Sequence, residues 1–351
     1  MIDTRNRPAS LLKATAALLI ATALLGASQA RPASSLAQTI AQLSEPDGYF
    51  DTDNLISNES SYLQVIPELA RRGVRGGAYV GVGPDQNFSY IAAMRPSIAF
   101  IIDIRRDNVL LHLLFKALFS LSRTRVDYLS MLFGRTIPPD DVQWRAATID
   151  RVVKYVEGAR PADAHALSEK IDRALRDTGV PLSDEDLRKI AGFHGRFIGA
   201  GLSLQFQSTG RPPQWNYPTY RDMLVDTDPE GKQSNFLASE DAFQFVKGLE
   251  SRDLVIPVVG DLAGPSALAG IGKLLGARRE TLSAFYASNV EFYLQREGSF
   301  PRFVANLRQI PRASHAVIIR SIFRRPNSAG RRPKDDSESE LQSIDELVGR
   351  Q

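Results

Sequence analysis

The chain of 351 residues contains no cysteine. This absence excludes a disulfide, a thiolate nucleophile, a zinc–thiolate site and an iron–sulfur cluster, because each of them needs a cysteine sulfur. Histidine is also scarce, and the four histidines are scattered along the chain without a His-x-x-x-His pair. We therefore expect structural roles for them and predict no metal site. The chain also lacks a Gly-x-Ser-x-Gly motif, so an α/β-hydrolase would have no nucleophile here.

A strong net charge is absent as well. The chain has 43 basic and 40 acidic residues, a formal charge of +3, and 43% hydrophobic residues, as in ordinary globular proteins. Residues 1–30 hold Arg5, Arg7 and Lys13 against Asp3, so without them the charge falls from +3 to +1. This balance lacks the broad basic field of nucleic-acid-binding proteins, and we predict no nucleic-acid partner.

The N-terminus has the pattern of a secretory signal peptide over residues 1–30. Basic residues precede the apolar run Ala14–Leu25, and Ser28 and Ala30 are small residues that suit the −3 and −1 positions of a cleavage site. The run is shorter than the roughly 20 residues that span a bilayer. We therefore expect an exported protein, periplasmic or extracellular, with no stable membrane span after cleavage; an uncleaved anchor is the alternative. Residues 31–45 are polar and alanine-rich, and are predicted to form a linker.

Strand-like runs alternate with helical patterns in the rest of the chain. Five continuous apolar runs are typical of strands buried on both faces: Ala78–Val82, Ser97–Ile104, Asp253–Leu262, Thr281–Ala287 and His315–Phe323. They predict a Rossmann-like α/β/α fold of three layers with a mostly parallel sheet over residues 46–323. Residues of about 123–250 break the alternation and predict a large, mainly helical insertion. Residues 324–351, rich in Arg, Pro, Ser and acids, are predicted to be a disordered tail.

A glycine turn follows the first predicted strand, in GGAYVGVGPDQ (76–86). Gly81 and Gly83 permit backbone conformations that other residues avoid, and they let a ligand approach the main chain closely. Asp103 ends the second predicted strand, 22 positions after Gly81, where a carboxylate can bind ribose hydroxyls. Two alternatives stay open: a tight turn without a ligand, and a carboxylate that satisfies N–H groups at a helix start.

Four stretches resemble the class I S-adenosylmethionine (SAM)-dependent methyltransferase superfamily, in the order in which that superfamily places them. They are GGAYVGVGPDQ (76–86), IIDI (101–104), VVGDL (258–262) and YASN (286–289). The chain is also similar to a little-characterised group of secreted bacterial proteins with a Rossmann-like core. The resemblance implies a SAM pocket whose candidate residues are Gly81, Gly83, Asp85, Asp103, Asp261, Asn289 and Glu59.

These candidates would have different roles. The resemblance implies that Asp103 holds the ribose, that Asp261 lies in the adenine-side loop, and that Asn289 follows the fourth strand, where many members face their substrate. Glu59 precedes the core, where an N-terminal helix often covers the cofactor pocket. A first-turn position in that helix, after an Asn58 cap, is the alternative for Glu59.

The glycine motif departs from the superfamily pattern. Tyr79 stands where an acid is usual, and Pro84 and Asp85 follow Gly83 where a third glycine is frequent. Pro84 removes an N–H donor, and Asp85 would repel a pyrophosphate, so a SAM-like ligand is favoured over a dinucleotide. With export, this predicts a methyltransferase-like protein that binds a small molecule or a protein partner without methyl transfer. An active SAM-dependent methyltransferase and a structural envelope protein are the alternatives, and the pattern assigns no catalytic residue.

Overall fold

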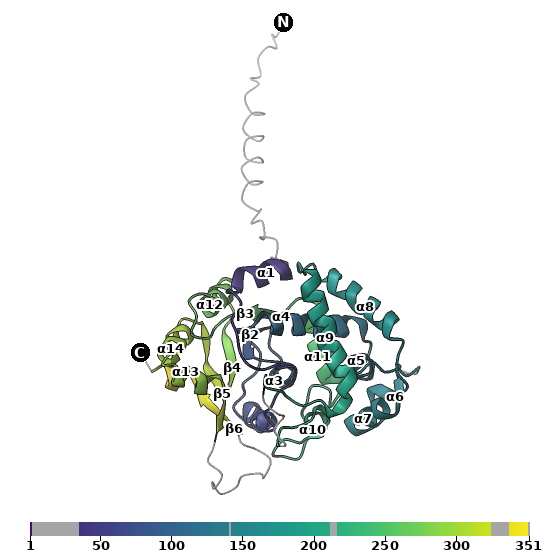
Figure 1. Ribbon diagram of the computed structural model, residues 1–351. Coiled ribbons are helices and arrows are strands. Elements are labelled where there is room, and N and C mark those ends of the chain that lie inside the picture. The colour runs from purple at the N-terminus through teal and green to yellow at the C-terminus, as the bar shows by residue number, and fades with distance from the viewer. Residues whose placement is uncertain (2–34, 140–141, 211–215, 324–336, 350–351) are drawn as a thin grey trace. The chain divides into compact units, whose positions relative to one another are not determined.

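The computed structural model describes Met1 and residues 35–139, 142–210, 216–323 and 337–349 (Figure 1). The predicted signal peptide lies outside these residues, as do residues 324–336 of the predicted tail and residues 211–215 of the insertion. In the described part of the chain, no helix has both the length and the apolar character needed to cross a membrane.

A six-stranded sheet has the order β3-β2-β1-β4-β5-β6. Its strands are β1 Ala78–Val82, β2 Ile98–Asp103, β3 Val255–Val259, β4 Leu282–Ser288, β5 Arg312–Phe323 and β6 Ser337–Ser343. The first five strands pair in parallel, and β6 pairs with β5 in the antiparallel direction. The predicted α/β class and mostly parallel sheet are therefore confirmed. Each of the five predicted runs contains or overlaps one of the parallel strands, because continuous apolar residues suit strands covered on both faces.

Helices fill the connections between the strands. Before β3 they are α1 Leu36–Leu43, η1 Ser61–Leu63, α2 Ile66–Arg71, α3 Gln86–Met94, α4 Arg106–Leu121, α5 Arg125–Leu132, α6 Val142–Arg145, α7 Ile149–Gly158, α8 Ala164–Asp177, α9 Asp184–Ala200, η2 Gly201–Ser203, α10 Tyr220–Val225 and α11 Glu240–Glu250. After β3 they are α12 Ala267–Arg278, α13 Val290–Arg296, α14 Phe300–Arg308 and α15 Ile344–Val348.

The helices α5–α11 all lie between α4 and β3 in the chain, within the segment predicted as a helical insertion. α4 packs against both α8 and α9 of this group, and α4 also contacts β2 and β3. Figure 1 shows α5–α9 in teal on one side of α4, away from the yellow-green strands β5 and β6. α4 therefore stands between the sheet and the inserted helices, which explains why its residues from Asn108 to Phe119 are buried.

Helix α1 occupies most of the segment predicted as a linker, so that prediction is wrong over Leu36–Leu43. Ser35 accepts the N–H of Gln38, and the Gln38 side chain accepts the N–H of Ser35, which closes a capping box. The apolar face of the helix is buried, and α1 packs against β3 and α12. The polar composition of the segment concealed a helix with one apolar face.

The prediction of disorder is also wrong for residues 337–348, which form β6 and α15. β6 is an edge strand that pairs with β5, and edge strands commonly carry polar and charged side chains, so its Ser- and Glu-rich sequence is compatible with this position. Ile344 and Val348 of α15 are buried, and Asp345 forms an ion pair with Arg312 of β5 at 2.6 Å. The described residues from Ser35 onward thus form one compact unit that includes this C-terminal segment.

Candidate functional site

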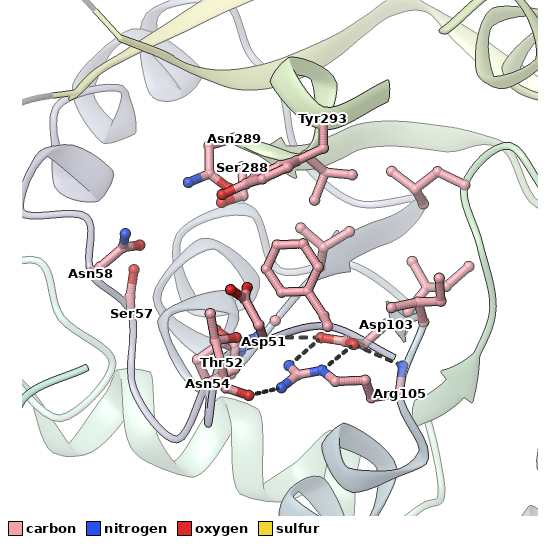
Figure 2. Close-up of a pocket in the computed structure, with 18 of the residues that line it drawn as sticks. Asp51, Thr52, Asn54, Ser57, Asn58, Asp103, Arg105, Ser288, Asn289 and Tyr293 are labelled. Atoms are coloured by element: carbon pink, nitrogen blue, oxygen red, sulfur yellow. Dashed lines mark hydrogen bonds and ion pairs between the residues drawn. The ribbon is translucent and has the colours of Figure 1, made fainter. Parts of the chain in front are cut away.

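A cavity of about 240 Å³ lies at the carboxyl ends of β1, β2, β3 and β4 (Figure 2). The residues at or just after those strand ends line it: Gly83, Pro84, Asp103, Gly260, Asp261, Ser288 and Asn289. Further walls come from residues 49–58 and from Phe206, Ser208 and Tyr217 of the insertion. The carboxyl edge of the strands is where open parallel sheets bind ligands. This cavity is therefore the candidate functional site.

The structure separates the seven predicted site residues into two groups. Four of them line the cavity, namely Gly83, Asp103, Asp261 and Asn289. Gly81, Asp85 and Glu59 are buried and are not part of its lining. That the four lining residues bind a ligand stays a prediction, but they are brought together from four separate connections of the chain.

The carboxylate of Asp103 is fully engaged by protein groups. Oδ1 accepts the backbone N–H of Arg105 at 2.9 Å and its Nε at 3.2 Å. Oδ2 accepts Nη2 of Arg105 at 3.1 Å and Nδ2 of Asn54 at 3.2 Å. Four donors match the roughly four lone-pair sites of a carboxylate. Ribose hydroxyls could be bound here only if Asn54 or Arg105 moved away (Figure 2).

The two glycines of the turn serve different purposes. Gly83 has φ +83° and lines the cavity, as a tight turn at a binding site requires. Gly81 lies inside β1, where an added Cβ would stand 2.0 Å from Oδ1 of Asn87 and 2.5 Å from the hydroxyl of Tyr79. That hydroxyl donates to Oδ1 of Asn87 at 2.7 Å. Gly81 is therefore needed for close packing against Tyr79 and Asn87.

Two buried side chains hold the carbonyl groups of this turn. Nδ2 of Asn87 donates to the carbonyls of Val82 at 2.9 Å and of Pro84 at 2.7 Å. Nε2 of His112, on α4, lies 2.9 Å from the Gly83 carbonyl. Burial lowers the pKa of His112 to about 4, so its imidazole is neutral at pH 7 and acts as a structural hydrogen-bond partner. The turn is thus held rigidly from the side opposite the cavity.

Asp85 points into the protein. It is 2% exposed, and Oδ2 accepts the hydroxyl of Tyr220, on α10, at 2.6 Å. Oδ1 has no hydrogen-bond partner among the described residues. Burial raises the pKa of Asp85 to about 6, and the hydrogen bond from Tyr220 offsets only part of that effect. The expectation that Asp85 belongs to the ligand pocket is therefore not met, because Asp85 connects the turn to the insertion.

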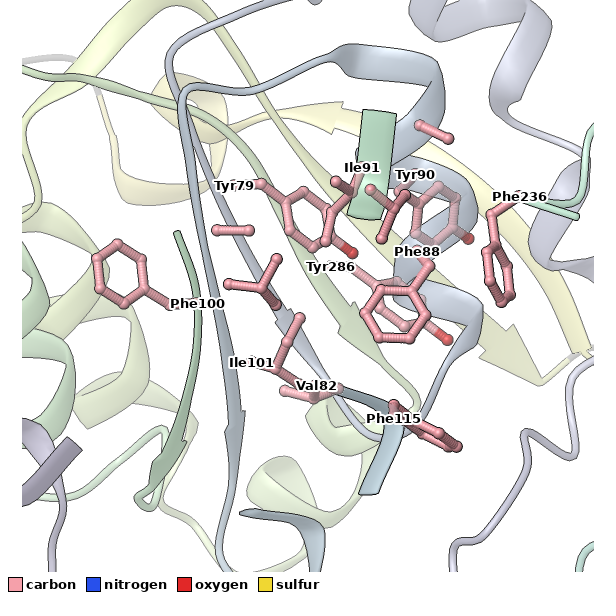
Figure 3. Close-up of a cluster of buried hydrophobic side chains, with 14 of the residues drawn as sticks. Tyr79, Val82, Phe88, Tyr90, Ile91, Phe100, Ile101, Phe115, Phe236 and Tyr286 are labelled. Carbon is pink, nitrogen blue, oxygen red and sulfur yellow. The ribbon is translucent and has the colours of Figure 1, made fainter. Parts of the chain in front are cut away.

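Behind the turn lies a cluster of buried aromatic side chains (Figure 3). The ring of Phe88, on α3, makes edge-to-face contacts with Phe115 and Phe119 of α4, at centroid distances of 5.9 Å and 5.3 Å. It contacts Phe236 of the insertion in the same way at 5.2 Å. The start of α3 is thus packed between α4 and the insertion, which is why Asp85, one residue before the helix, is directed inward.

Glu59 lies beneath the cavity and reaches it through another residue. Its carboxylate is 2% exposed and accepts the hydroxyls of Tyr286 at 2.7 Å and Ser321 at 2.6 Å, and that of Ser288 as well. Ser288 lines the cavity and has φ +52°, an uncommon backbone conformation for serine. Glu59 is therefore a positioning group for Ser288, and η1 begins only at Ser61.

Glu45 is an acid near the site that sequence patterns did not single out. Its carboxylate accepts the N–H groups of Asp261 at 3.0 Å, Ser266 at 2.7 Å and Ala267 at 2.9 Å. Burial raises the pKa of Glu45, but together these hydrogen bonds lower it by more than burial raises it. The pKa of Glu45 is therefore below its usual value. Glu45 thus supports the loop between β3 and α12, while Asp261 accepts only the nearby N–H of Ala263 at 2.8 Å among the described contacts of its side chain.

The cavity lining also contains aromatic residues, of which Phe50, Phe206 and Tyr293 were not singled out by any sequence pattern. Phe50 packs edge-to-face on Tyr293 of α13 at 5.0 Å, and Phe206 packs in the same way on Tyr217 at 5.4 Å. Figure 2 shows Tyr293 and Asn289 on one side of the cavity and Asp51 on the other. No local pattern reveals these contacts, because each ring meets its partner only once the chain has folded.

The described residues also do not meet the requirements of a metal site. No group of three or more His, Asp or Glu side chains is placed to hold a metal ion there.

A family model matches residues 54–137 and 206–345, more than half of the chain, and describes a domain of unknown function (DUF7790). The chain belongs to the DUF7790 family. The matched segments contain the whole described sheet and most of the cavity lining. Helices α6–α9 lie between the two segments, so they are outside the part that defines the DUF7790 domain. No curated protein matches the chain.

Proposed function

We propose that this DUF7790 protein is a Rossmann-like, methyltransferase-like binding protein that holds a small organic ligand at the strand ends without transferring a methyl group. The main support is the convergence of Gly83, Asp103, Asp261 and Asn289 on one cavity. The strand order β3-β2-β1-β4-β5-β6 is that of doubly wound nucleotide-binding sheets, although β6 here is antiparallel. In such sheets the carboxyl edge is the usual place for a ligand.

SAM fits this cavity poorly in the pose that the resemblance implies. The acid expected to hold ribose, Asp103, is saturated by Arg105 and Asn54. Pro84 offers no N–H, and Asp85 is directed away from the cavity. The volume of about 240 Å³ is below the roughly 300 Å³ at which cavities for drug-sized ligands begin. These features favour a ligand smaller than SAM, and we derive no methyl-transfer step.

An active SAM-dependent methyltransferase is the second candidate. It is favoured by one observation, namely that Gly83, Asp103 and Asp261 reach one cavity in the chain order of that superfamily. For this function, the Asn54 side chain would have to release Asp103 when the ribose binds. The two candidates therefore differ in what Asp103 does.

Calorimetric titration of the purified protein with SAM and S-adenosylhomocysteine separates them. We expect no binding at micromolar concentrations, with circular dichroism showing an intact fold. Micromolar binding of SAM that is lost in Asp103→Asn would overturn the proposal in favour of the methyltransferase. Asp107→Asn is the matched control, because Asp107 lies on the first turn of α4, outside the cavity lining.

A screen of small fragments tests the proposed binding itself. A charge-balanced panel of cations, neutral molecules and anions of about ten non-hydrogen atoms would be screened by ligand-observed NMR. We expect hits that are lost when Ser288→Phe fills the cavity in a protein whose circular dichroism shows an intact fold, while the same substitution at the exposed Ser203 leaves them. A panel without any hit would contradict the proposed function.

Export belongs to the proposal as well, on the pattern of residues 1–30. N-terminal sequencing of the protein from the cell envelope or the medium is expected to begin at Arg31. A chain that retains Met1 would contradict cleavage.

A further inference from the structure

The cavity lining has an excess of acidic side chains. Among the described lining residues are Asp51, Asp103, Asp261 and Glu297, and the only basic one is Arg105. Arg105 is bound to Asp103 at 3.1 Å, and both side chains are about nine-tenths buried. Asp261 and Glu297 add further negative charge to the lining, which attracts a cation and repels phosphate or carboxylate ligands. The charge of the lining thus favours small cations over small anions.

Aromatic side chains stand beside these acids. Tyr293 lines the cavity with Phe50, and their rings meet edge-to-face at a centroid distance of 5.0 Å. Tyr217 and Phe206 form a second such pair in the lining, at 5.4 Å. Aromatic faces bind alkylated ammonium groups, both by their apolar surface and by the negative potential above the ring. The walls therefore suit a cation with an organic surface better than a small inorganic ion.

One buried acceptor in the lining needs a hydrogen-bond donor. Gln86 is 3% exposed and lines the cavity next to the glycine turn. Its Nε2 donates to the hydroxyl of Tyr286 at 3.4 Å, which fixes the orientation of the amide. Its Oε1 has no hydrogen-bond partner among the described residues. A buried amide oxygen is costly to leave unpaired, so a ligand hydroxyl or N–H would complete it.

From these three observations we infer that the cavity binds a small organic ammonium ion that carries a hydrogen-bond donor, such as an amino alcohol. This inference rests on the proposed function, because it names the ligand class of the same cavity. The acids provide the charge preference, the aromatic rings contact the alkyl groups, and Gln86 accepts from the donor. Binding is expected to weaken with rising salt concentration, because the attraction is partly electrostatic.

Choline and its neutral isostere 3,3-dimethylbutan-1-ol test the charge preference directly, because they differ in one atom at the branched centre. Both would be titrated into the purified protein at low salt by ligand-observed NMR and calorimetry, with inorganic phosphate as the anion. We expect choline to bind about ten-fold more tightly than the neutral alcohol, which corresponds to a cation–aromatic and ionic contribution of ordinary size. Phosphate is expected not to bind.

Substitutions then assign the effect to the cavity. Glu297→Gln removes an exposed acid at the mouth without disturbing the core, and it is expected to weaken choline several-fold while leaving the neutral alcohol unchanged. Gln86→Leu is expected to weaken both molecules, since both carry the hydroxyl. Glu169→Gln is the control, because Glu169 is an exposed residue of α8 outside the lining.

The outcomes distinguish this inference from the proposed function. Equal or tighter binding of the neutral alcohol, or binding of phosphate in preference to choline, would overturn the ammonium assignment while the cavity remained a binding site. No binding of any of the three probes also overturns it, and the fragment screen then decides whether the proposed function fails too.

Discussion

Replacing Asp85 with asparagine is expected to stabilise the protein near neutral pH. Burial raises the pKa of this carboxyl from its usual 3.8 to about 6, so the folded state disfavours the charged form. The direction of the pH dependence follows from the difference between the pKa in the folded state and the pKa in the unfolded state. Stability from this group is fully present below pH 3.8 and is lost progressively as the pH rises from there through about 6, because over that interval the unfolded state has released a proton that the folded state still holds. Asparagine resembles the protonated acid and does not titrate.

The magnitude follows from the size of the pKa shift. A difference of about two pKa units corresponds to roughly 3 kcal/mol at most, which is the expected gain of Asp85→Asn at pH 7.5. Near pH 4 the gain should be close to zero. The amide can still accept the hydroxyl of Tyr220, and its NH₂ group occupies the position of the unpaired Oδ1. Part of the gain is expected to be lost through reorganisation around the amide.

Urea unfolding of both proteins at pH 4.5, 5.5, 6.5 and 7.5 measures this difference, provided that the slope of stability against urea is unchanged. Asp186→Asn is the control, because the expected change in stability at neutral pH has the opposite sign. The side-chain hydrogen bond from Arg106 lowers the pKa of Asp186 to about 2, so its loss should destabilise the protein at neutral pH. An Asp85→Asn protein that is less stable at pH 7.5, or a difference that does not vary with pH, would refute the reasoning.

Three further substitutions test the packing around the site, each by urea unfolding. Gly81→Ala should cost about 1–3 kcal/mol, because the new Cβ would stand 2.0 Å from Oδ1 of Asn87; a neutral effect would mean that the turn can open. Glu45→Gln should cost about 1–2 kcal/mol through weaker acceptance of three backbone N–H groups, and an unchanged midpoint would contradict this support of the β3–α12 loop. Phe88→Ala should cost about 3–5 kcal/mol, and a loss below 1 kcal/mol would show that the aromatic cluster can collapse.

The position of Asp85 gives the glycine turn two distinct faces. Gly83 and Pro84 face the cavity, while Asp85 and Asn87 face the interior. The bond from Tyr220 to Asp85 joins this turn to α10, and Tyr217, three residues earlier, lines the cavity. The insertion therefore contributes both to the wall of the site and to the support of the turn beneath it.

Much of the sheet could be predicted because its strands are continuous apolar runs. Such runs are stable only where both faces are covered, so they indicate a central parallel sheet without further information. α1 and β6 escaped prediction for the opposite reason. α1 buries one face only, and β6 is an edge strand rich in Ser and Glu, so polar residues dominate the composition of both segments. Residues 31–45 and 324–351 were consequently assigned no regular structure, which is wrong for 36–43 and 337–348.

The same physical reasoning explains which residues of the candidate site could be predicted from the sequence. Gly83, Asp103, Asp261 and Asn289 were found because each follows a recognisable strand, and parallel strands bring such positions to one edge. The sequence alone thus determined the five parallel strands of the sheet and the edge at which the cavity lies.

Only the tertiary structure decided which groups face that cavity. The direction of Asp85 depends on Tyr220, which lies 135 positions later in the chain. The saturation of Asp103 depends on Asn54, 49 positions earlier, and the aromatic mouth depends on Phe50 meeting Tyr293. Contacts between such distant segments follow from the packing of whole elements, and no local pattern of residues encodes them.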